Sequence, residues 1–388
     1  MTRLEFLLAG TLLRLLAALF SLLPLQKRKV VLATARLARL EGNLAYLHAE
    51  MRRRRPDLRY VLLLQPYSYG LAGKLAYLGR LIVAMYHVRT ARLIVIDNAY
   101  LPVHVAPPRR GATVVQVWHA VAALKRFGVD TAVPVAEPER TFLHRYYTHA
   151  VVSSEATRRP AAAALRTPLE RVLALGTPRT DFFFDQAALA QARDETIARY
   201  PALSGRRVVL YAPTFRGRGR AKAAAAGLDT ARLRRLLPDE LTLALKTHPN
   251  LDPSATDDTG FDVVVEPDYE INRVLAATDI LVTDYSSSIF EFALLRRPII
   301  LLVPDLADYE RDPGLYLDYR TEMIGVQVAT TDEVAAAVTG GQFDLAGYEA
   351  FIERHLGACD GHASERFVEH FLPTGRRSGP SGPPAAAE

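Results

Sequence analysis

Short apolar runs separated by polar turns dominate the chain between residues 30 and 303. In the first half such runs occupy 30–33, 60–64, 93–96, 114–117, 151–152 and 172–175. After a polar, helix-prone connector at 187–200 the pattern restarts, with runs at 208–211, 241–245, 263–265, 280–283 and 299–303. Apolar strands that alternate with helices are typical of parallel sheets with helices on both faces. The pattern therefore predicts an α/β fold made of two Rossmann-like halves.

The first 28 residues follow a different pattern. The segment from Leu4 to Leu25 is nearly all apolar, interrupted by the charged residues Glu5 and Arg14. It is long enough to span a bilayer, but an arginine near its middle is costly in hydrocarbon. The basic residues 27–29 that follow suit an anionic membrane surface. We expect residues 1–28 to form a helix attached to the membrane surface; a signal peptide and a core helix of the first domain are the alternatives.

Length and composition set the limits of the remaining parts. The chain has 388 residues, a net charge of +6 and one cysteine. This length allows two domains, which we place at 29–186 and 187–374, and the Gly/Ser/Pro/Ala-rich residues 375–388 are expected to be disordered. The basic balance favours anionic partners such as nucleotides or acidic lipids. A nucleic-acid partner is not expected because the basic residues are scattered, without an aromatic-interleaved stripe. A single cysteine favours a reducing compartment.

The stretch 278–303 carries the clearest chemical signal. A buried run ends at Asp284, and three serines, Ser286, Ser287 and Ser288, precede a short helical segment. The free backbone N–H groups at a helix start, together with the helix dipole, bind phosphate. The turn is therefore predicted to be an anion site. The alternative is N-capping, because Ser288 and Glu291 have the spacing of a capping box.

One histidine follows an apolar strand in each half of the chain. His119 comes after the run 114–117, and His248 comes after the run 241–245. Ligands of open α/β sheets bind at such strand ends, so we expect both imidazoles to face one cleft. Histidine can take a proton from a hydroxyl or, when charged, stabilise a phosphate. The alternative for each is a structural histidine bonded to backbone. No metal site is expected, since no cluster has metal-ligand spacing and the acidic run 305–312 suits a solvated loop.

Three basic residues lie near the same strand ends. Arg179 follows the turn 176–178, and its forked donors match a phosphate. A salt bridge to Asp181 is the alternative for Arg179. Arg216 and Lys246 are weaker candidates for the same cleft because each is a single basic residue.

Five polar segments occur together in a fixed order. They are Gln116-Val117-Trp118-His119 with Leu124-Lys125 downstream, Gly176-Thr177-Pro178-Arg179-Thr180-Asp181, Tyr211-Ala212-Pro213-Thr214-Phe215-Arg216, Lys246-Thr247-His248-Pro249 and Thr283-Asp284-Tyr285-Ser286-Ser287-Ser288. With these segments, and the later Asp318-Tyr319, the chain resembles the CDP-glycerol glycerophosphotransferases, the teichoic-acid primases and polymerases. The resemblance covers roughly residues 30 to 370.

The resemblance implies a GT-B architecture, with the active site between two Rossmann-like domains, and a peripheral enzyme on the cytoplasmic face of the membrane. The family transfers glycerol phosphate, or in relatives ribitol phosphate, from a CDP-activated donor to a hydroxyl of a membrane-linked acceptor, and we expect glycerol phosphate here. CMP is released, and no cofactor is expected. By position, His119 and His248 correspond to the essential histidines. The residues placed at the donor by position are Thr214, Arg216, Ser286 and Ser287. We expect Asp284 and Ser288 of the same turn to lie there as well.

The resemblance leads to a mechanistic hypothesis in which His119 takes the proton of the acceptor hydroxyl. His248, Arg179 and the N–H groups of 286–288 hold the donor diphosphate, and Lys246 adds positive charge. Ala120, Phe215 and Thr177 differ from the residues that are usual in the family at these positions. These differences bear on the acceptor and the polyol rather than on the reaction class. The absence of a long N-terminal extension favours a priming or single-addition enzyme. The alternatives are a GT-B glycosyltransferase that uses a nucleotide sugar, with Glu291 on a ribose hydroxyl in either case, and a non-catalytic nucleotide-binding protein of the membrane surface.

Overall fold

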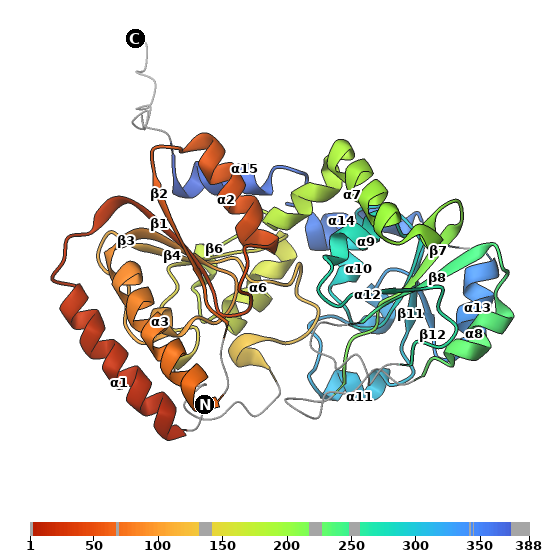
Figure 1. Ribbon diagram of the computed structural model, residues 1–388, viewed down its shortest axis with the longest axis horizontal. Helices are drawn as coiled ribbons and strands as arrows, with labels where there is room; N and C mark the ends of the chain where they lie inside the picture. The colour runs from red at the N-terminus through yellow and green to blue at the C-terminus, as the bar shows by residue number, and fades with distance from the viewer. Residues whose placement is uncertain are drawn as a thin grey trace, which may run out of the picture.

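The molecule has two halves, each built around one parallel sheet (Figure 1). The computed structural model describes residues 3–66, 70–131, 142–216, 227–247, 257–340, 343 and 345–373. The N-terminal sheet has the order β2-β1-β3-β4-β5-β6 and the C-terminal sheet the order β12-β11-β10-β7-β8-β9. All neighbouring strands in both sheets pair in parallel. The prediction of two Rossmann-like halves is thereby confirmed.

The bounds of the elements follow from the backbone. The strands are β1 (Gln26–Thr34), β2 (Arg59–Leu64), β3 (Ala91–Ile96), β4 (Thr113–Gln116), β5 (His149–Val151), β6 (Val172–Leu173), β7 (Arg207–Tyr211), β8 (Leu241–Lys246), β9 (Val263–Val265), β10 (Ile280–Thr283), β11 (Ile299–Leu302) and β12 (Val326–Val328). The helices are α1 (Arg3–Phe20), α2 (Gly42–Arg54), α3 (Gly70–Thr90), α4 (Leu101–His104), α6 (Glu155–Ala164), α7 (Gln186–Arg199), α8 (Thr230–Leu236), α9 (Ile271–Ala276), α10 (Ser288–Ala293), α11 (Leu306–Arg311), α12 (Tyr319–Glu322), α13 (Thr331–Gly340), α14 (Gly347–Leu356) and α15 (Ala363–Phe371). Short 3-10 turns include η1 (Gly128–Asp130) and η3 (Pro178–Phe184).

The central strands of each sheet are buried on both faces, which explains why they are almost continuously apolar. In β1, Val31 and Ala33 belong to one hydrophobic cluster, while Val30 and Leu32 belong to another on the opposite face. The same alternation divides β7 between two clusters. Side chains of a strand point alternately to its two faces, so an all-apolar run fills two cores at once.

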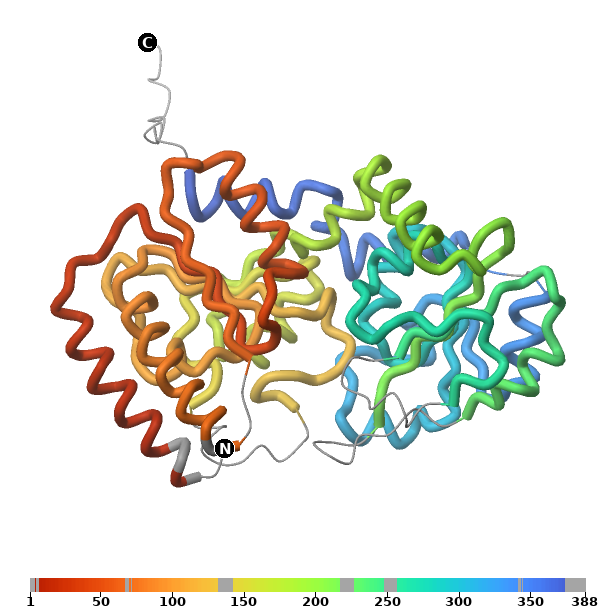
Figure 2. The backbone as a smooth tube through the Cα atoms, in the orientation of Figure 1, coloured from red at the N-terminus to blue at the C-terminus, as the bar shows by residue number. Residues whose placement is uncertain are grey.

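The chain passes from one half to the other through η3 and α7, and its last helix returns (Figure 2). Phe367 and Val368 of α15 join the cluster that also contains Leu44 and Leu47 of α2. Arg54 donates to Glu369 at 2.9 Å. We expected residues 187–374 to form the second domain, but α15 packs on the N-terminal half, where its apolar face covers α2.

The N-terminal helix α1 is apolar on two opposite faces. One face packs on α3 through Leu13 and Ala17. The other face exposes leucines that recur at helical spacing, including Leu8 at 63%, Leu15 at 66% and Leu19 at 57% exposure. Figure 1 shows α1 beside α3 at the outer edge of the molecule. Among the described residues, no helix is both long and apolar enough to cross a membrane.

Lys29 lies away from the surface. We expected residues 27–29 to face an anionic membrane, but Lys29 is 1% exposed and its Nζ donates to Thr90 Oγ1 at 2.6 Å. β1 begins at Gln26, which pairs with Ala91, so the side chain of Lys29 points into the protein. Lys27 and Arg28 remain exposed.

Candidate active site between the two sheets

Three neighbouring strands of the N-terminal sheet deliver polar residues at their carboxyl ends. β1, β3 and β4 lie side by side. Arg36 follows β1, Asp97 follows β3, and His119 follows β4. Because the carboxyl ends of parallel strands meet at one edge, these residues share the edge at which α/β proteins bind ligands.

The peptide before His119 is held in an unusual conformation. Trp118 has a φ of 51°, in the left-handed region that non-glycine residues rarely adopt. Gln116 Oε1 accepts the N–H of Trp118 at 2.8 Å, and Gln116 Nε2 donates to the Tyr147 hydroxyl at 3.1 Å. The indole ring lies 4.8 Å from the ring of Phe127 and 4.7 Å from the His119 imidazole. Such strain persists where its surroundings hold it, and it is concentrated at functional sites.

Two further side chains bind the carbonyl groups of the same segment. Asn43 Nδ2 donates to the carbonyl of Trp118 at 2.7 Å. Arg179 Nη1 donates to the carbonyl of His119 at 2.8 Å, and the Arg179 backbone N–H donates to Asn43 Oδ1 at 3.1 Å. Arg179 Nη2 forms an ion pair with Glu291 at 2.8 Å. Since Glu291 belongs to α10, Arg179 connects His119 to the C-terminal half.

Two alternatives from the sequence are wrong. Asp181 does not pair with Arg179, because its carboxylate accepts the backbone N–H groups of Ala363 and Ser364 at 2.9 Å each and so caps α15. Glu291 does not form a capping box, because its carboxylate pairs with Arg179.

The side chain of Ser286 stabilises the serine turn 286–288 through hydrogen bonds within it. Ser286 Oγ accepts the N–H of Ser288 at 3.2 Å and lies 2.8 Å from Ser288 Oγ. Ser287 occupies the N-cap position without a side-chain capping bond, and Ser286 and Ser287 are half-buried. The described residues thus place the turn at the carboxyl end of β10, as predicted, while its role toward a phosphate stays a prediction.

Asp284 organises the loop after β7. Its carboxylate accepts the Thr214 N–H and hydroxyl at 2.9 Å each, and it accepts Arg216 Nη1 at 2.8 Å. Arg216 Nε donates to Asp305 at 2.6 Å. Burial alone would lower the pKa of Arg216, but its bonds to Asp305 and the charge of Asp284 outweigh burial and raise the pKa. Asp284, Thr214 and Arg216, which we expected at the donor, thus form one hydrogen-bonded network.

Lys125 enters this network from the N-terminal half. Its Nζ lies 5.4 Å from the centre of the Tyr309 ring, which stacks on Tyr285 at 3.7 Å. The Arg216 guanidinium lies 5.1 Å from each of these rings. Burial lowers the pKa of Lys125 to about 8, although the charge of Asp284 opposes the shift. We did not predict Lys125 as a site residue, although it belongs to one of the matching segments.

Lys246 has a different environment from the one expected. Its side chain is buried, and its Nζ donates to the carbonyls of Glu266 and Pro267 at 2.8 Å each. Burial lowers the pKa of Lys246 to about 8. Lys246 therefore anchors the turn that leads to α9, and two of its three N–H donors are used there.

His248 lies outside the described residues, so its predicted role stays a prediction. Within the described ranges, no group of three His, Cys, Asp or Glu residues could hold a metal ion. The acidic residues after β11 are instead used in ion pairs, Asp305 with Arg216 and Asp308 with Arg311.

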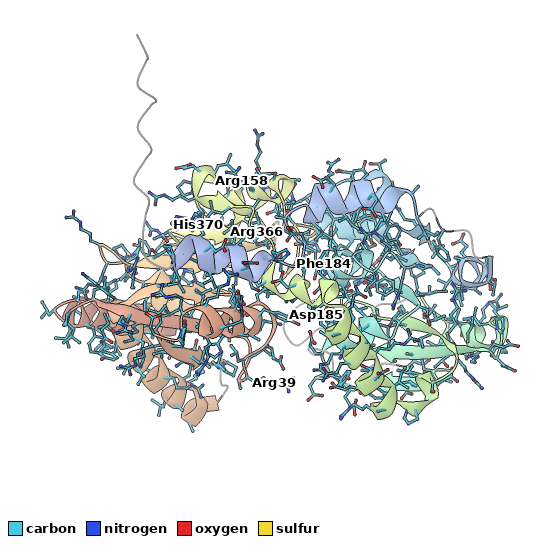
Figure 3. All side chains as sticks on the ribbon, turned by 90° about the horizontal axis from the view of Figure 1, so that it is seen from above. Arg39, Arg158, Phe184, Asp185, Arg366 and His370 are labelled. Atoms are coloured by element: carbon cyan, nitrogen blue, oxygen red, sulfur yellow. The ribbon has the colours of Figure 1, made fainter. Side chains whose placement is uncertain are left out.

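Other contacts also join the two halves near their strand ends. Arg39 donates to the carbonyl of Asp268 at 2.9 Å, and Figure 3 shows Arg39 between the halves. Lys125 forms an antiparallel bridge with Leu315. Phe184 and Asp185, also labelled in Figure 3, lie where the chain crosses into α7. Two Rossmann-like units whose strand ends meet in this way define a protein of the GT-B type, the architecture that we expected.

Comparison with known proteins identifies the family. The profile of the CDP-Glycerol:Poly(glycerophosphate) glycerophosphotransferase family matches residues 15–372. The chain belongs to this family, as the resemblance implied, and the expectation of a phosphotransferase is confirmed at that level.

Individual relatives agree with this assignment. The chain is 33% identical over 378 residues to the teichoic acid ribitol-phosphate primase of Bacillus spizizenii, covering 94% of this chain and 96% of the relative. It is 34% identical over 359 residues to the teichoic acid poly(ribitol-phosphate) polymerase of the same species, covering 91% of this chain but only 57% of the relative. The solved wall teichoic acid polymerase TagF superposes with a TM-score of 0.74 at 20% identity over 92% of each chain, which shows a shared fold.

Proposed function

We propose that the protein transfers a polyol phosphate from a CDP-linked donor to a hydroxyl of a membrane-linked acceptor, with release of CMP, in teichoic-acid-like polymer synthesis. The observation that carries the proposal is the restraint on His119, whose backbone segment is held by Gln116, Asn43 and Arg179. Because the two relatives described above are named for ribitol phosphate, we propose ribitol rather than the expected glycerol as the polyol.

In the proposed reaction an acceptor hydroxyl attacks the β-phosphorus of the donor. His119 takes the hydroxyl proton as the new P–O bond forms, and the bond to the CMP oxygen breaks with its electron pair going to CMP. The serine turn at 286–288 and the cations Lys125 and Arg216 hold the diphosphate, with His248 added by resemblance. Loss of a positioned base costs ~10²–10⁴ in rate, so His119→Ala should lower kcat far more than donor affinity.

The exposed face of α1 supports attachment to a membrane surface. Leu8, Leu15 and Leu19 lie on that face, and the exposed Lys27 and Arg28 follow the helix. An apolar face with neighbouring basic residues inserts into the interface of anionic bilayers. The proposed site is the cytoplasmic face, where a lipid-linked acceptor would be within reach.

Sedimentation with phosphatidylglycerol vesicles tests the attachment. Leu8→Asp/Leu15→Asp should release the protein from the vesicles, because two charges then interrupt the apolar face. Leu169→Asp, at a leucine that is 40% exposed in another part of the surface, is the matched control and should bind like the wild type. Equal binding of all three proteins would exclude α1 as the membrane contact.

Measuring the nucleotide released by purified protein tests the reaction. CDP-ribitol, CDP-glycerol and a UDP-sugar are offered separately with a membrane extract as acceptor. We expect the wild type to release CMP from CDP-ribitol, and we expect His119→Ala to abolish this release. Release from CDP-glycerol alone would change the polyol, and UDP release alone would move the protein to the nucleotide-sugar glycosyltransferases. If no nucleotide is released or bound in calorimetry, the proposal is rejected.

A further inference from the structure

Two residues at the sheet edge that carries His119 have no role in the proposed reaction. Arg36 follows β1 and Asp97 follows β3, and β3 lies between β1 and β4 in the N-terminal sheet. They lie in the half that does not contain the serine turn or the loop after β7. Together with His119 they lie at the carboxyl-end edge of the N-terminal sheet.

Asp97 is a buried carboxyl group with unused hydrogen-bonding capacity. It is 3% exposed, and its buried Oδ1 has no hydrogen-bond partner. Burial raises the pKa of Asp97, while a hydrogen bond from Thr34 and the charge of Arg36 oppose the rise. An unsatisfied buried acceptor is costly, and it persists where a ligand supplies the missing donor.

Arg36 differs from the other arginines of this region in having an uncommitted side chain. Within the described part of the chain, its guanidinium forms no hydrogen bond or ion pair, and only its backbone N–H donates, to Thr34 Oγ1 at 3.1 Å. By contrast, Arg179 is paired with Glu291, and Arg39 with Glu41 and Asp268. Desolvation by the surrounding protein lowers the pKa of Arg36, the charges of Asp97 and Glu41 oppose this shift, and the charge of Arg179 adds to it. The Arg36 residue itself is exposed to solvent.

We propose that Arg36 and Asp97 form the acceptor subsite, in which Arg36 binds a phosphodiester anion and Asp97 accepts a hydrogen bond from a polyol hydroxyl. This inference rests on the proposed function. A forked guanidinium matches the oxygens of a phosphodiester, and a carboxylate oxygen matches a hydroxyl. The preferred acceptor is therefore a chain that already ends in a polyol phosphate. A neutral sugar terminus would leave the guanidinium unused.

Two soluble probes separate recognition of charge from recognition of hydroxyls. One is glycerol linked to octanol through a phosphodiester, and the other is the uncharged octyl glycerol ether. For Arg36→Ala we expect KM to rise about 10- to 100-fold for the charged probe, because a charge-assisted contact is lost, and to stay unchanged for the ether. Arg36→Lys should restore part of the affinity. Arg59→Ala, at the exposed amino end of β2, is the matched control and should behave like the wild type.

Asp97→Asn keeps the shape of the side chain and should raise KM for both probes while leaving the Kd of the CDP-linked donor unchanged. An equal rise for both probes in Arg36→Ala, or no rise for either, would overturn the assignment of Arg36. If the wild type releases no CMP with either probe, the proposed function fails for these acceptors. Calorimetry with the charged probe then tests the acceptor subsite separately from the reaction. Binding of the probe to the wild type that is lost in Arg36→Ala supports the subsite, and any other result rejects it.

Discussion

The ion pair between Arg179 and Glu291 allows a direct test of whether Arg179 positions His119 or binds the donor. The Glu291 side chain is 1% exposed and that of Arg179 is 14% exposed, with 2.8 Å between Nη2 and Oε2. Oε1 of Glu291 and Nε of Arg179 are both buried without a hydrogen-bond partner. The pair is therefore nearly dry, and each charge depends on the other.

The expected costs follow from this burial. Arg179→Met leaves the carboxylate of Glu291 without a counter-charge, which costs about 3–5 kcal/mol of unfolding free energy. Glu291→Gln keeps a neutral acceptor for Arg179 and should cost about 1–2 kcal/mol, the difference between charged and neutral hydrogen bonds. The double variant buries no charge at this position, so its cost should fall below the sum of the single costs by about 2 kcal/mol.

Urea unfolding followed by tryptophan fluorescence measures these costs, because Trp118 is the only tryptophan and lies at the site. In the same variants, Arg179→Met should lower kcat because the carbonyl of His119 loses its donor. Calorimetry should find the Kd of the CDP-linked donor little changed. Costs that add within about 0.5 kcal/mol would refute the coupling. A large rise in donor Kd with kcat intact would instead make Arg179 a phosphate ligand.

Three further predictions concern charge burial, backbone strain and the clamp on Trp118. Burial lowers the pKa of Lys246 from 10.5 to about 8, so between pH 8 and pH 10.5 the unfolded chain binds more protons than the folded protein. Stability should therefore rise with pH in that window by up to about 1.4 kcal/mol per unit in the wild type relative to Lys246→Met, as urea unfolding at each pH would measure. Gly176 has a φ of 91°, and a Cβ there would lie 2.1 Å from the carbonyl oxygen of Ala358, so Gly176→Ala should cost at least ~2 kcal/mol in urea unfolding. Gly79→Ala, where a Cβ meets nothing within 4 Å on helix α3, should instead stabilise by about 0.5–1 kcal/mol. Gln116→Leu removes the acceptor for the Trp118 N–H and should lower kcat for CMP release without changing donor Kd; an unchanged kcat would refute the positioning role of Gln116.

The pattern of the central strands could be predicted because these strands are buried on both faces. The runs 280–283 and 299–303 correspond closely to β10 and β11, whose residues are all buried. The first strand was predicted too short. Gln26 and the charged residues after it lack the apolar pattern of a strand, and they belong to β1 only because they pair with β2 and β3. Helix α3 was not predicted, because its own apolar residues are distributed around the whole helix. No single apolar stripe therefore marks its buried face.

The sequence placed several candidate residues at strand ends, but it did not predict their contacts. Strand ends correctly located His119, Thr214 and Asp284 at the edges where the halves meet. Sequence spacing favoured local partners, such as Asp181 for Arg179, whereas the actual partner is Glu291, 112 residues away. A local pattern carries no information on such a pair. Asn43 stands alone at the start of α2, outside every matching segment, so its contact with Trp118 could not be foreseen.

The position of His119 depends on both halves of the molecule. Gln116 and Asn43 hold the segment from the N-terminal half, while Arg179 holds the His119 carbonyl and also binds Glu291 in α10. Glu291 lies three residues beyond Ser288, the last serine of the turn proposed to hold the donor. A shift of α10 relative to the N-terminal sheet must therefore either break the ion pair or move the carbonyl of His119. The same contact joins the element that would bind the donor to the residue that would activate the acceptor.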